Sequence, residues 1–116
     1  MRGKPLDQLR QEARGCLRLP RVPAHCRHNG HLFHVLLPDG PTRDALLDHL
    51  RAREIGAVFH YVPLHLSPMG RRFGYGPGDL PRTEDLAGRL VRLPCFFGLG
   101  AAQQDRVVRE VGAFFA

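Results

Sequence analysis

Residues 56–68 place an apolar, β-branched run directly in front of a cluster of polar aromatic groups. The run opens after a glycine as Ala-Val-Phe and is stopped by Pro63. A run bounded in this way is typical of a buried strand that ends in a loop, with His60, Tyr61 and His65 clustered at the exit. Because loops at strand ends often carry binding groups, these three residues are candidates for a substrate-binding site. The alternative is that they are amphipathic residues at the rim of a core.

The segment before this run predicts a helix packed against a sheet. Residues 31–37 are apolar on both faces and end at a Pro-Asp-Gly-Pro turn, which predicts a central strand. Thr42 is expected to cap a helix over residues 43–54, and Gly56 is expected to end it. Strand, helix and strand in this order imply a crossover helix on one face of a sheet.

The remaining segments complete a one-domain architecture. Residues 5–16 have helical spacing, residues 17–23 suit an extended edge segment, and residues 92–96 suit a short strand. Residues 83–91 and 101–115 predict two more helices. The predicted fold is therefore an α/β (α+β) two-layer sandwich, in which three helices cover one face of a small mixed or antiparallel sheet. The buried face of the helix that begins at Thr83 is expected to be Leu86, Ala87, Leu90 and Val91.

Residues 69–82 hold four glycines and two prolines, so they are expected to form a loop without regular structure. A loop of this length in a compact domain is often functional. Arg71 and Arg72 could bind a diphosphate through charge-assisted hydrogen bonds, and Tyr75 could stack on a base. The alternative is a solvated, flexible loop. The glycines do not form a nucleotide-binding P-loop, because the G-x-x-x-x-G-K-[ST] pattern is missing.

Residues 25–31 read HCRHNGH and place four possible zinc ligands close together. The spacing argues against a structural zinc site, because such sites take their ligands from two separated pairs and no second cysteine pair follows. The alternative is that Asn29 and Gly30 form a turn that leads into a strand.

The charge pattern argues against nucleic-acid binding. The chain has 17 basic and 11 acidic residues, which gives a formal net charge of +6, and Lys4 is its single lysine. The arginines are scattered, acidic residues lie between them, and no recognition motif accompanies the charge.

The hydropathy and the cysteines of the chain indicate the compartment in which we expect the protein. No apolar stretch approaches the length that spans a membrane, and no secretory signal begins the chain. The cysteines Cys16, Cys26 and Cys95 are odd in number and far apart, which is unlike a disulfide framework. We therefore expect a soluble protein in a reducing cytoplasm.

Residues 60–65 read HYVPLH, and other short motifs surround this one in a fixed order. The ordered set resembles the C-terminal region of DegT-type sugar aminotransferases. Within that family it is most similar to dTDP-4-amino-4,6-dideoxygalactose transaminases, which aminate a nucleotide-linked 4-keto-6-deoxyhexose. The resemblance covers residues 16–115. The surrounding motifs are Arg27 to Phe33, Ser67-Pro68 with Gly70, Phe73-Gly74, Thr83 to Asp85, Arg92 to Pro94 with Phe96, and Gln103 to Asp105 with Val107.

The resemblance implies the small C-terminal domain of a fold-type-I pyridoxal phosphate enzyme. Residues 25–116 would be that domain, and residues 1–24 would be a remnant of the inter-domain helix and linker. The missing large domain would carry the catalytic lysine and bind the cofactor, and the whole protein would be a homodimer that uses glutamate as amino donor. The implied substrate-binding residues are His60, Tyr61, His65, Arg71, Arg72 and Tyr75, with Asn29 and His31 as secondary candidates.

No catalytic residue is expected in this chain, because Lys4 lies outside every matching motif. The chain alone is therefore expected to bind no pyridoxal phosphate covalently and to be inactive. Two other function classes stay open at this point. One is a small binding or interaction module that uses the exposed loop. The other, less favoured, is a zinc-binding domain built on His and Cys, with His60 or His65 and the cluster at residues 25–31.

Overall fold

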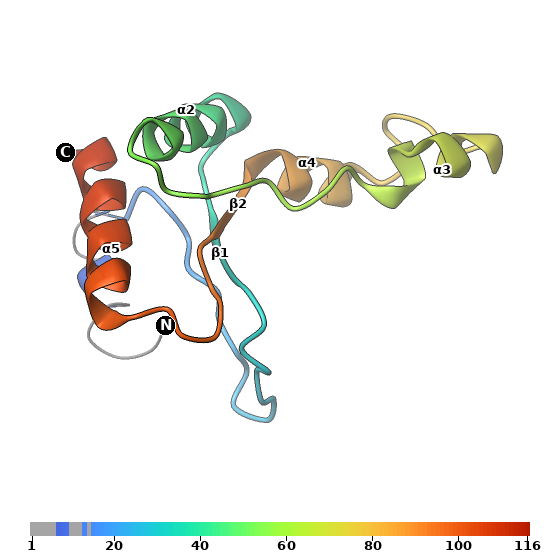
Figure 1. Ribbon diagram of the computed structural model, residues 1–116. Helices are drawn as coiled ribbons and strands as arrows, with labels where there is room; N and C mark the ends of the chain where they lie inside the picture. The colour runs from blue at the N-terminus through green and yellow to red at the C-terminus, as the bar shows by residue number, and fades with distance from the viewer. Residues whose placement is uncertain (1–6, 10–12, 14) are drawn as a thin grey trace.

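The computed structural model describes residues 7–9, 13 and 15–116 of the chain (Figure 1). The helices within these ranges are too short or too polar to cross a lipid bilayer. In chain order the elements are β1 (Phe33–Leu36), α2 (Gly40–Ala52), the 3-10 helix η1 (Leu64–Leu66), α3 (Pro68–Arg72), α4 (Pro81–Arg89), β2 (Leu90–Leu93) and α5 (Ala101–Phe115).

Two antiparallel strands form the centre of the sheet. β1 pairs with β2, with His34 opposite Arg92. An isolated bridge joins Arg18 to the outer side of β1, and another joins Val58 to the outer side of β2. β1 is therefore central, and the segment around Arg18 lies at an edge, as the sequence predicted. The segment around Val58 runs parallel to β1 on the far side of β2, so α2 is the expected crossover helix.

The hydrophobic core lies between one face of this sheet and the helices α2 and α5. This arrangement confirms the predicted two-layer α+β sandwich with a small antiparallel sheet. The residues that are fully buried in it include Val35, Leu37, Leu46, Leu50, Val91, Val108 and Val111, joined by Leu9 from the N-terminal segment.

The prediction of a buried strand after Gly56 is wrong. Only Val58 makes a bridge, and both Val58 and Phe59 are half exposed. The helices cover one face of the sheet. Among the described residues, this segment pairs with β2 only at Val58, and no strand pairs with its outer edge. An apolar run at such an edge therefore stays largely in solvent.

The ends of α2 also differ from the prediction. Asp39, and not Thr42, caps the helix, because its Oδ1 accepts a hydrogen bond of 2.7 Å from the Thr42 backbone N–H. Gly40 and the following proline then open the helix three residues earlier than expected. At the other end Glu54, with a φ of 58°, takes the left-handed conformation that was expected of Gly56.

Residues 69–82 are more regular than predicted. Ser67 caps α3 by accepting a hydrogen bond of 3.1 Å from the Gly70 N–H, so a Ser-Pro helix start was missed. Proline also opens α4, which begins at Pro81 and not at Thr83.

The helix α4 has no buried residue, and it ends at Arg89. Leu90 and Val91, expected on its buried face, belong instead to β2, which begins two residues before the predicted strand at residues 92–96. α4 makes its main contacts with α2 and not with the sheet.

The two ends of the chain mostly follow the predictions. α5 covers the predicted residues 101–115. Near the N-terminus, Asp7–Leu9 is helical, and Leu9 and Ala13 are buried, whereas Gly15 and Cys16 are not helical. Residues 5, 6, 10–12 and 14 of the predicted helix over 5–16 lie outside the described residues.

Candidate functional site

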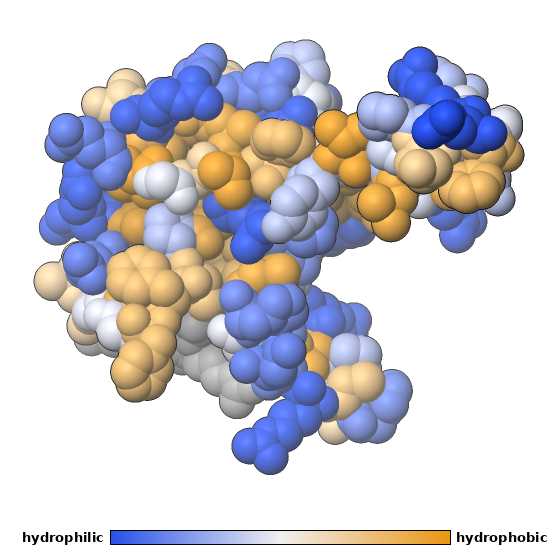
Figure 2. All heavy atoms as spheres, turned by 45° about the vertical axis from the view of Figure 1, so that its right-hand side comes forward, coloured by the Kyte–Doolittle hydropathy of each residue, from blue (hydrophilic) through white to orange (hydrophobic). Residues whose placement is uncertain are grey.

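We call residues 63–80 the arm. It holds η1, α3 and a glycine-rich loop, and it projects away from the body of the molecule in Figure 1. Figure 2 shows it as a separate lobe whose surface mixes apolar and strongly polar patches. Leu64 and Phe73 expose 86% and 75% of their surfaces. Monomeric proteins seldom leave so much apolar surface in water, so the arm has the character of a contact region.

His60 and Tyr61 lie where the chain leaves the sheet for the arm. Val58 exchanges two backbone hydrogen bonds with Arg92, of 2.7 and 3.2 Å, and these bonds place the chain against β2 two residues before His60. The rings of His60 and Tyr61 are 5.2 Å apart, and the Arg92 guanidinium carbon lies 5.9 Å from the centre of the Tyr61 ring. Both His60 and Tyr61 are exposed, as predicted for residues at the rim of a site.

Tyr61 has a backbone φ of 91°, a conformation that bulky residues rarely adopt. Such a conformation costs about 1–3 kcal/mol and is found mainly at functional sites, where the surrounding structure enforces it. Tyr61 as a whole residue is 70% exposed, so its burial does not offset this cost. Its backbone conformation supports a role of Tyr61 in binding.

Several basic side chains lie near His34 in β1. Burial lowers the pKa of His34 in β1, and the positive charges of His60, His28 and Arg18 lower that pKa further. His34 is therefore neutral at pH 7. In the antiparallel register it stands opposite Arg92, so the two side chains share one face of the sheet. The sequence did not indicate this grouping, because only the strand register brings the residues together.

His65 does not lie on the exposed rim where it was predicted. Its side chain is only 4% exposed, and its Nε2 lies 3.4 Å from the Glu84 Oε2. Neither ring nitrogen makes a hydrogen bond with the described residues. The expectation failed because η1 turns the chain inward at His65, whereas continued strand alternation would have left this side chain at the surface.

The other predicted residues of the arm are exposed. The Arg71 Nε donates a hydrogen bond of 3.1 Å to the Leu66 carbonyl, and Arg72 ends α3. Tyr75 is half exposed, and its backbone N–H donates to the Gly70 carbonyl. Arg71 and Arg72 are the last residues of α3, and Tyr75 lies in the loop that follows, so all three residues lie in the arm and away from the sheet.

Asn29 and His31 are in a different place. They precede β1, whereas the arm begins near the other end of that strand. The Asn29 Oδ1 accepts a hydrogen bond from the His31 N–H and also contacts the His31 Nδ1, and Gly30 has a φ of 72°. This is the turn predicted for Asn29 and Gly30. Within the described part of the chain, no three His, Cys, Asp or Glu side chains lie close enough to hold a metal ion.

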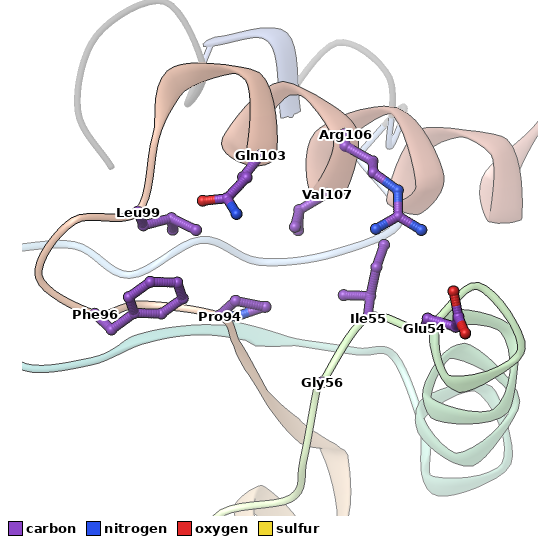
Figure 3. A pocket seen from close by; sticks show the side chains of 9 residues that line it. All are labelled: Glu54, Ile55, Gly56, Pro94, Phe96, Leu99, Gln103, Arg106 and Val107. Carbon is purple, nitrogen blue, oxygen red and sulfur yellow. The ribbon is translucent and has the colours of Figure 1, made fainter.

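A pocket of about 340 Å³ opens on the side of α5, and no pattern in the sequence predicted it (Figure 3). Ile55 and Val107 are buried at its floor, and Phe96 lies at one end. Gln103 and Arg106 line its wall, but each already bonds to the backbone, of Gly100 and of Arg53 respectively. The pocket is therefore mainly apolar.

The family model of the DegT/DnrJ/EryC1/StrS aminotransferase family matches residues 3–112, nearly the whole chain. The chain belongs to this family. This agrees with the resemblance carried by the motif at residues 60–65.

Relatives of known name give the same result. The chain is 37% identical over 81 residues to the dTDP-3-amino-3,4,6-trideoxy-alpha-D-glucose transaminase of Streptomyces venezuelae, which covers 69% of this chain and 21% of that protein. It is 36% identical over 86 residues to the pleiotropic regulatory protein of Geobacillus stearothermophilus, covering 73% and 23%. Sugar transaminases are therefore among its homologues.

Solved structures confirm the fold of this family member. The S. venezuelae DesV protein, solved in complex with a ketimine intermediate, matches 96% of this chain with a TM-score of 0.82 and 32% identity. A family aminotransferase from Brucella abortus matches 97% with a TM-score of 0.77 and 27% identity. In both cases the match covers 30% of the solved chain. The chain thus spans less than a third of the length of its relatives.

The residues of this chain do not fit a complete pyridoxal phosphate site. Such a site holds the cofactor aldehyde as a Schiff base on a lysine amine. Lys4 is the single lysine of the sequence and lies outside the described residues, and the described part brings no lysine to the exposed rings of His60 and Tyr61. The side chains near His60 and Tyr61 are instead aromatic rings, imidazoles and guanidinium groups.

Proposed function

We propose that this chain is the small domain of a longer pyridoxal phosphate-dependent aminotransferase that acts on a nucleotide-linked keto sugar. Residues 25–116 form the domain, and residues 1–24 belong to the inter-domain helix and linker. The finer form of the proposal is transfer of an amino group from glutamate to a 4-keto-6-deoxy sugar. Membership of the family supports the reaction class, and the transaminases among its homologues support the sugar.

The observation that carries the proposal is the exposed, strained Tyr61 at the root of the arm. Its ring offers a flat apolar face for a substrate, and His60 beside it can donate or accept a hydrogen bond. Farther out, Arg71 and Arg72 provide charge for a diphosphate, and Tyr75 provides a ring for a base. His65, being buried, supports the arm and does not touch the substrate in this proposal.

The cofactor would be held by the rest of the longer protein, where it would act as the electron sink of the transamination. The chain alone would then be inactive. To test this, the chain is mixed with pyridoxal phosphate and reduced with borohydride, and the label is mapped by mass spectrometry. Slow labelling of Lys4 that does not saturate is the expected result of ordinary amine chemistry. Saturable, stoichiometric labelling with turnover would contradict the proposal.

The reaction itself can be tested with a chimaera. In the S. venezuelae transaminase, the segment that matches this chain is replaced by the corresponding residues of this chain. We expect a soluble protein with cofactor absorbance that aminates a dTDP-linked 4-keto-6-deoxy sugar with glutamate. Cofactor absorbance is the folding control. A chimaera that holds the cofactor but aminates no nucleotide-linked sugar, while the parent enzyme does so under the same conditions, would overturn the proposal.

The alternative of a small interaction module has one observation in its favour, the exposed Leu64 and Phe73 of the arm. An interaction module would bind a protein partner without any cofactor in the longer protein. The chimaera separates the two functions, because a module would not restore amination. In the aminotransferase proposal, the same apolar side chains contact the large domain or a second subunit of a homodimer.

A further inference from the structure

The carboxylate of Glu84 lies where the arm returns to the body. Its Oε1 and Oε2 accept hydrogen bonds of 2.9 and 3.1 Å from the backbone N–H of Gly78 in the glycine-rich loop. Glu84 lies in the first turn of α4, where the helix dipole favours a negative charge. The Gly78 N–H is the main cause that lowers the pKa of Glu84, so the group is a carboxylate at neutral pH.

The same carboxylate faces His65 from the other side. The His65 Nε2 lies 3.4 Å from the Glu84 Oε2, and the Glu84 side chain is itself only 22% exposed. A carboxylate can only accept hydrogen bonds, so an imidazole N–H at Nε2 is the donor that this position suits. A slight approach of the two groups would then complete a charge-assisted hydrogen bond.

Glu84 therefore joins three parts of the chain: η1 through His65, the glycine-rich loop through Gly78, and α4 through its own backbone. Other support for the arm is sparse. α3 makes its main contacts with η1, which is part of the arm itself. Gly74 and Gly78 have φ values of 92° and 90°, and loops with such residues have many alternative conformations. The loop has hydrogen bonds of its own, such as that from the Gly76 N–H to the Asp79 Oδ2, but the Glu84 carboxylate is the side chain that bonds it from outside the arm.

We propose that Glu84 is the positioning residue of the arm. Its carboxylate contacts Gly78 and His65, and these two contacts, which we call the grip, hold the glycine-rich loop in one conformation for ligand binding. The proposal rests on the proposed function in one respect, namely that Arg71, Arg72 and Tyr75 meet a nucleotide diphosphate. The grip itself depends only on the contacts described above. Among the described residues, His65 is the titratable side chain that acts on the pKa of Glu84. The backbone N–H of Gly78 and a backbone hydrogen bond at Leu80 also lower this pKa, and desolvation opposes them.

Hydrogen exchange measures the grip directly. We expect Glu84→Ala to speed exchange of the Gly78 amide about tenfold, because a hydrogen bond to a charged group is lost. Glu84→Gln keeps an oxygen acceptor and should give a smaller change. Asp85→Asn is the matched control, since Asp85 is the next residue but pairs with Arg89 on the exposed side of α4. Exchange in β1 reports whether each variant is folded.

The pH dependence of the protection of the Gly78 amide shows whether the charge of Glu84 or its packing alone holds the loop. In the wild-type chain, protection of Gly78, corrected for the intrinsic rate, should fall once the pH drops below about 4.5, the ordinary value of Glu84. In Glu84→Gln this change should be absent. Unchanged protection of Gly78 in Glu84→Ala with β1 intact would overturn the proposal. If that variant does not fold, an identical pH profile in the wild type and Glu84→Gln would overturn it instead.

Binding of dTDP, followed by NMR, connects the grip to the ligand. We expect dTDP to shift the signals of Arg71, Arg72 and Tyr75, and to bind about tenfold more weakly to Glu84→Ala than to Asp85→Asn. Equal binding to both variants, although the loop is loosened in the first, would refute the positioning role. If dTDP does not bind even the wild-type chain while Glu84→Ala still loosens the loop, the proposed ligand of the arm is wrong and the grip stands.

Discussion

Gly70 lies directly against the backbone of His65. A Cβ atom at position 70 would stand 2.8 Å from the His65 Cα and 2.3 Å from the Leu64 carbonyl oxygen. Both distances are shorter than a carbon atom tolerates, and the opposing atoms belong to the backbone, which cannot rotate away. α3 can fold back on η1 in this way only because residue 70 has no side chain.

We therefore expect Gly70→Ala to destabilise the arm by about 1–3 kcal/mol, the usual cost of inserting a group into a tightly packed place. Gly76→Ala is the matched control, because Gly76 lies in the same arm with open space around its Cα and without a positive φ. Hydrogen exchange of residues 64–75 measures the difference. Equal exchange in the two variants would show that η1 and α3 do not pack as described.

The core makes a second, independent prediction. Leu50 in α2 is fully buried among the sheet residues and α5, whereas Leu64 in η1 is almost fully exposed. Leu50→Ala should lower the free energy of unfolding by about 2–5 kcal/mol, through lost burial and the cavity left behind. Leu64→Ala should change it by less than about 0.5 kcal/mol. Urea unfolding followed by circular dichroism measures both, and comparable losses would contradict the assigned core.

The parts of the fold that follow periodicity could be predicted from the sequence. The helix at residues 101–115 and the central strand at residues 31–37 have long or doubly apolar patterns, and both are found. The strand after Gly56 failed for a tertiary reason. Its pattern is that of a buried strand, but burial needs a covering element, and nothing in the described part of this chain, which matches less than a third of its solved relatives, covers it.

The candidate site shows the same division. The exposure of His60 and Tyr61 could be predicted because they adjoin a strand-like run, and a local pattern is enough for that; their role in binding stays a prediction. Arg92 could not be found, because it reaches Tyr61 only through the pairing of Val58 with β2. The inward turn at His65 depends on a single 3-10 turn, and patterns of period 2 or 3.6 do not reveal such a turn.

Acid should weaken the start of α2. The backbone N–H of Thr42 holds the pKa of Asp39 below its ordinary value of 3.8. A group whose pKa is lowered by folding stabilises the fold above the unfolded value, and this contribution is lost as the pH falls through the lower, folded value. The loss therefore begins below about pH 4, and it adds to the loss from Glu84.

Asp39→Asn tests this point, because asparagine caps a helix about as well as aspartate but does not titrate. At pH 7 we expect stability close to that of the wild type, and between pH 4 and pH 2 a shallower loss. Asp48→Asn, which removes an exposed carboxylate from the same helix, should keep the wild-type slope. Thermal unfolding at a series of pH values gives the slopes. A wild-type slope in Asp39→Asn would mean that the cap does not contribute.

The backbone of Tyr61 supplies the last prediction. Glycine adopts a φ near 91° without strain, so Tyr61→Gly removes a cost of about 1–3 kcal/mol, against a loss of about 1 kcal/mol from the greater freedom of the unfolded chain. Its unfolding free energy should therefore equal or exceed that of the wild type. Val62→Gly, next to it, also exposed but without a positive φ, should lose up to about 1 kcal/mol.

The same substitution should impair binding, because it removes the ring that lies beside His60 and Arg92. In the chimaera with the S. venezuelae transaminase, Tyr61→Gly should raise the KM for the nucleotide-linked sugar about tenfold, as expected when one stacked ring is lost. Val62→Gly should leave that KM unchanged. A variant at Tyr61 that is both less stable than the wild type and unchanged in KM would show that the conformation of Tyr61 supports the fold and not the substrate.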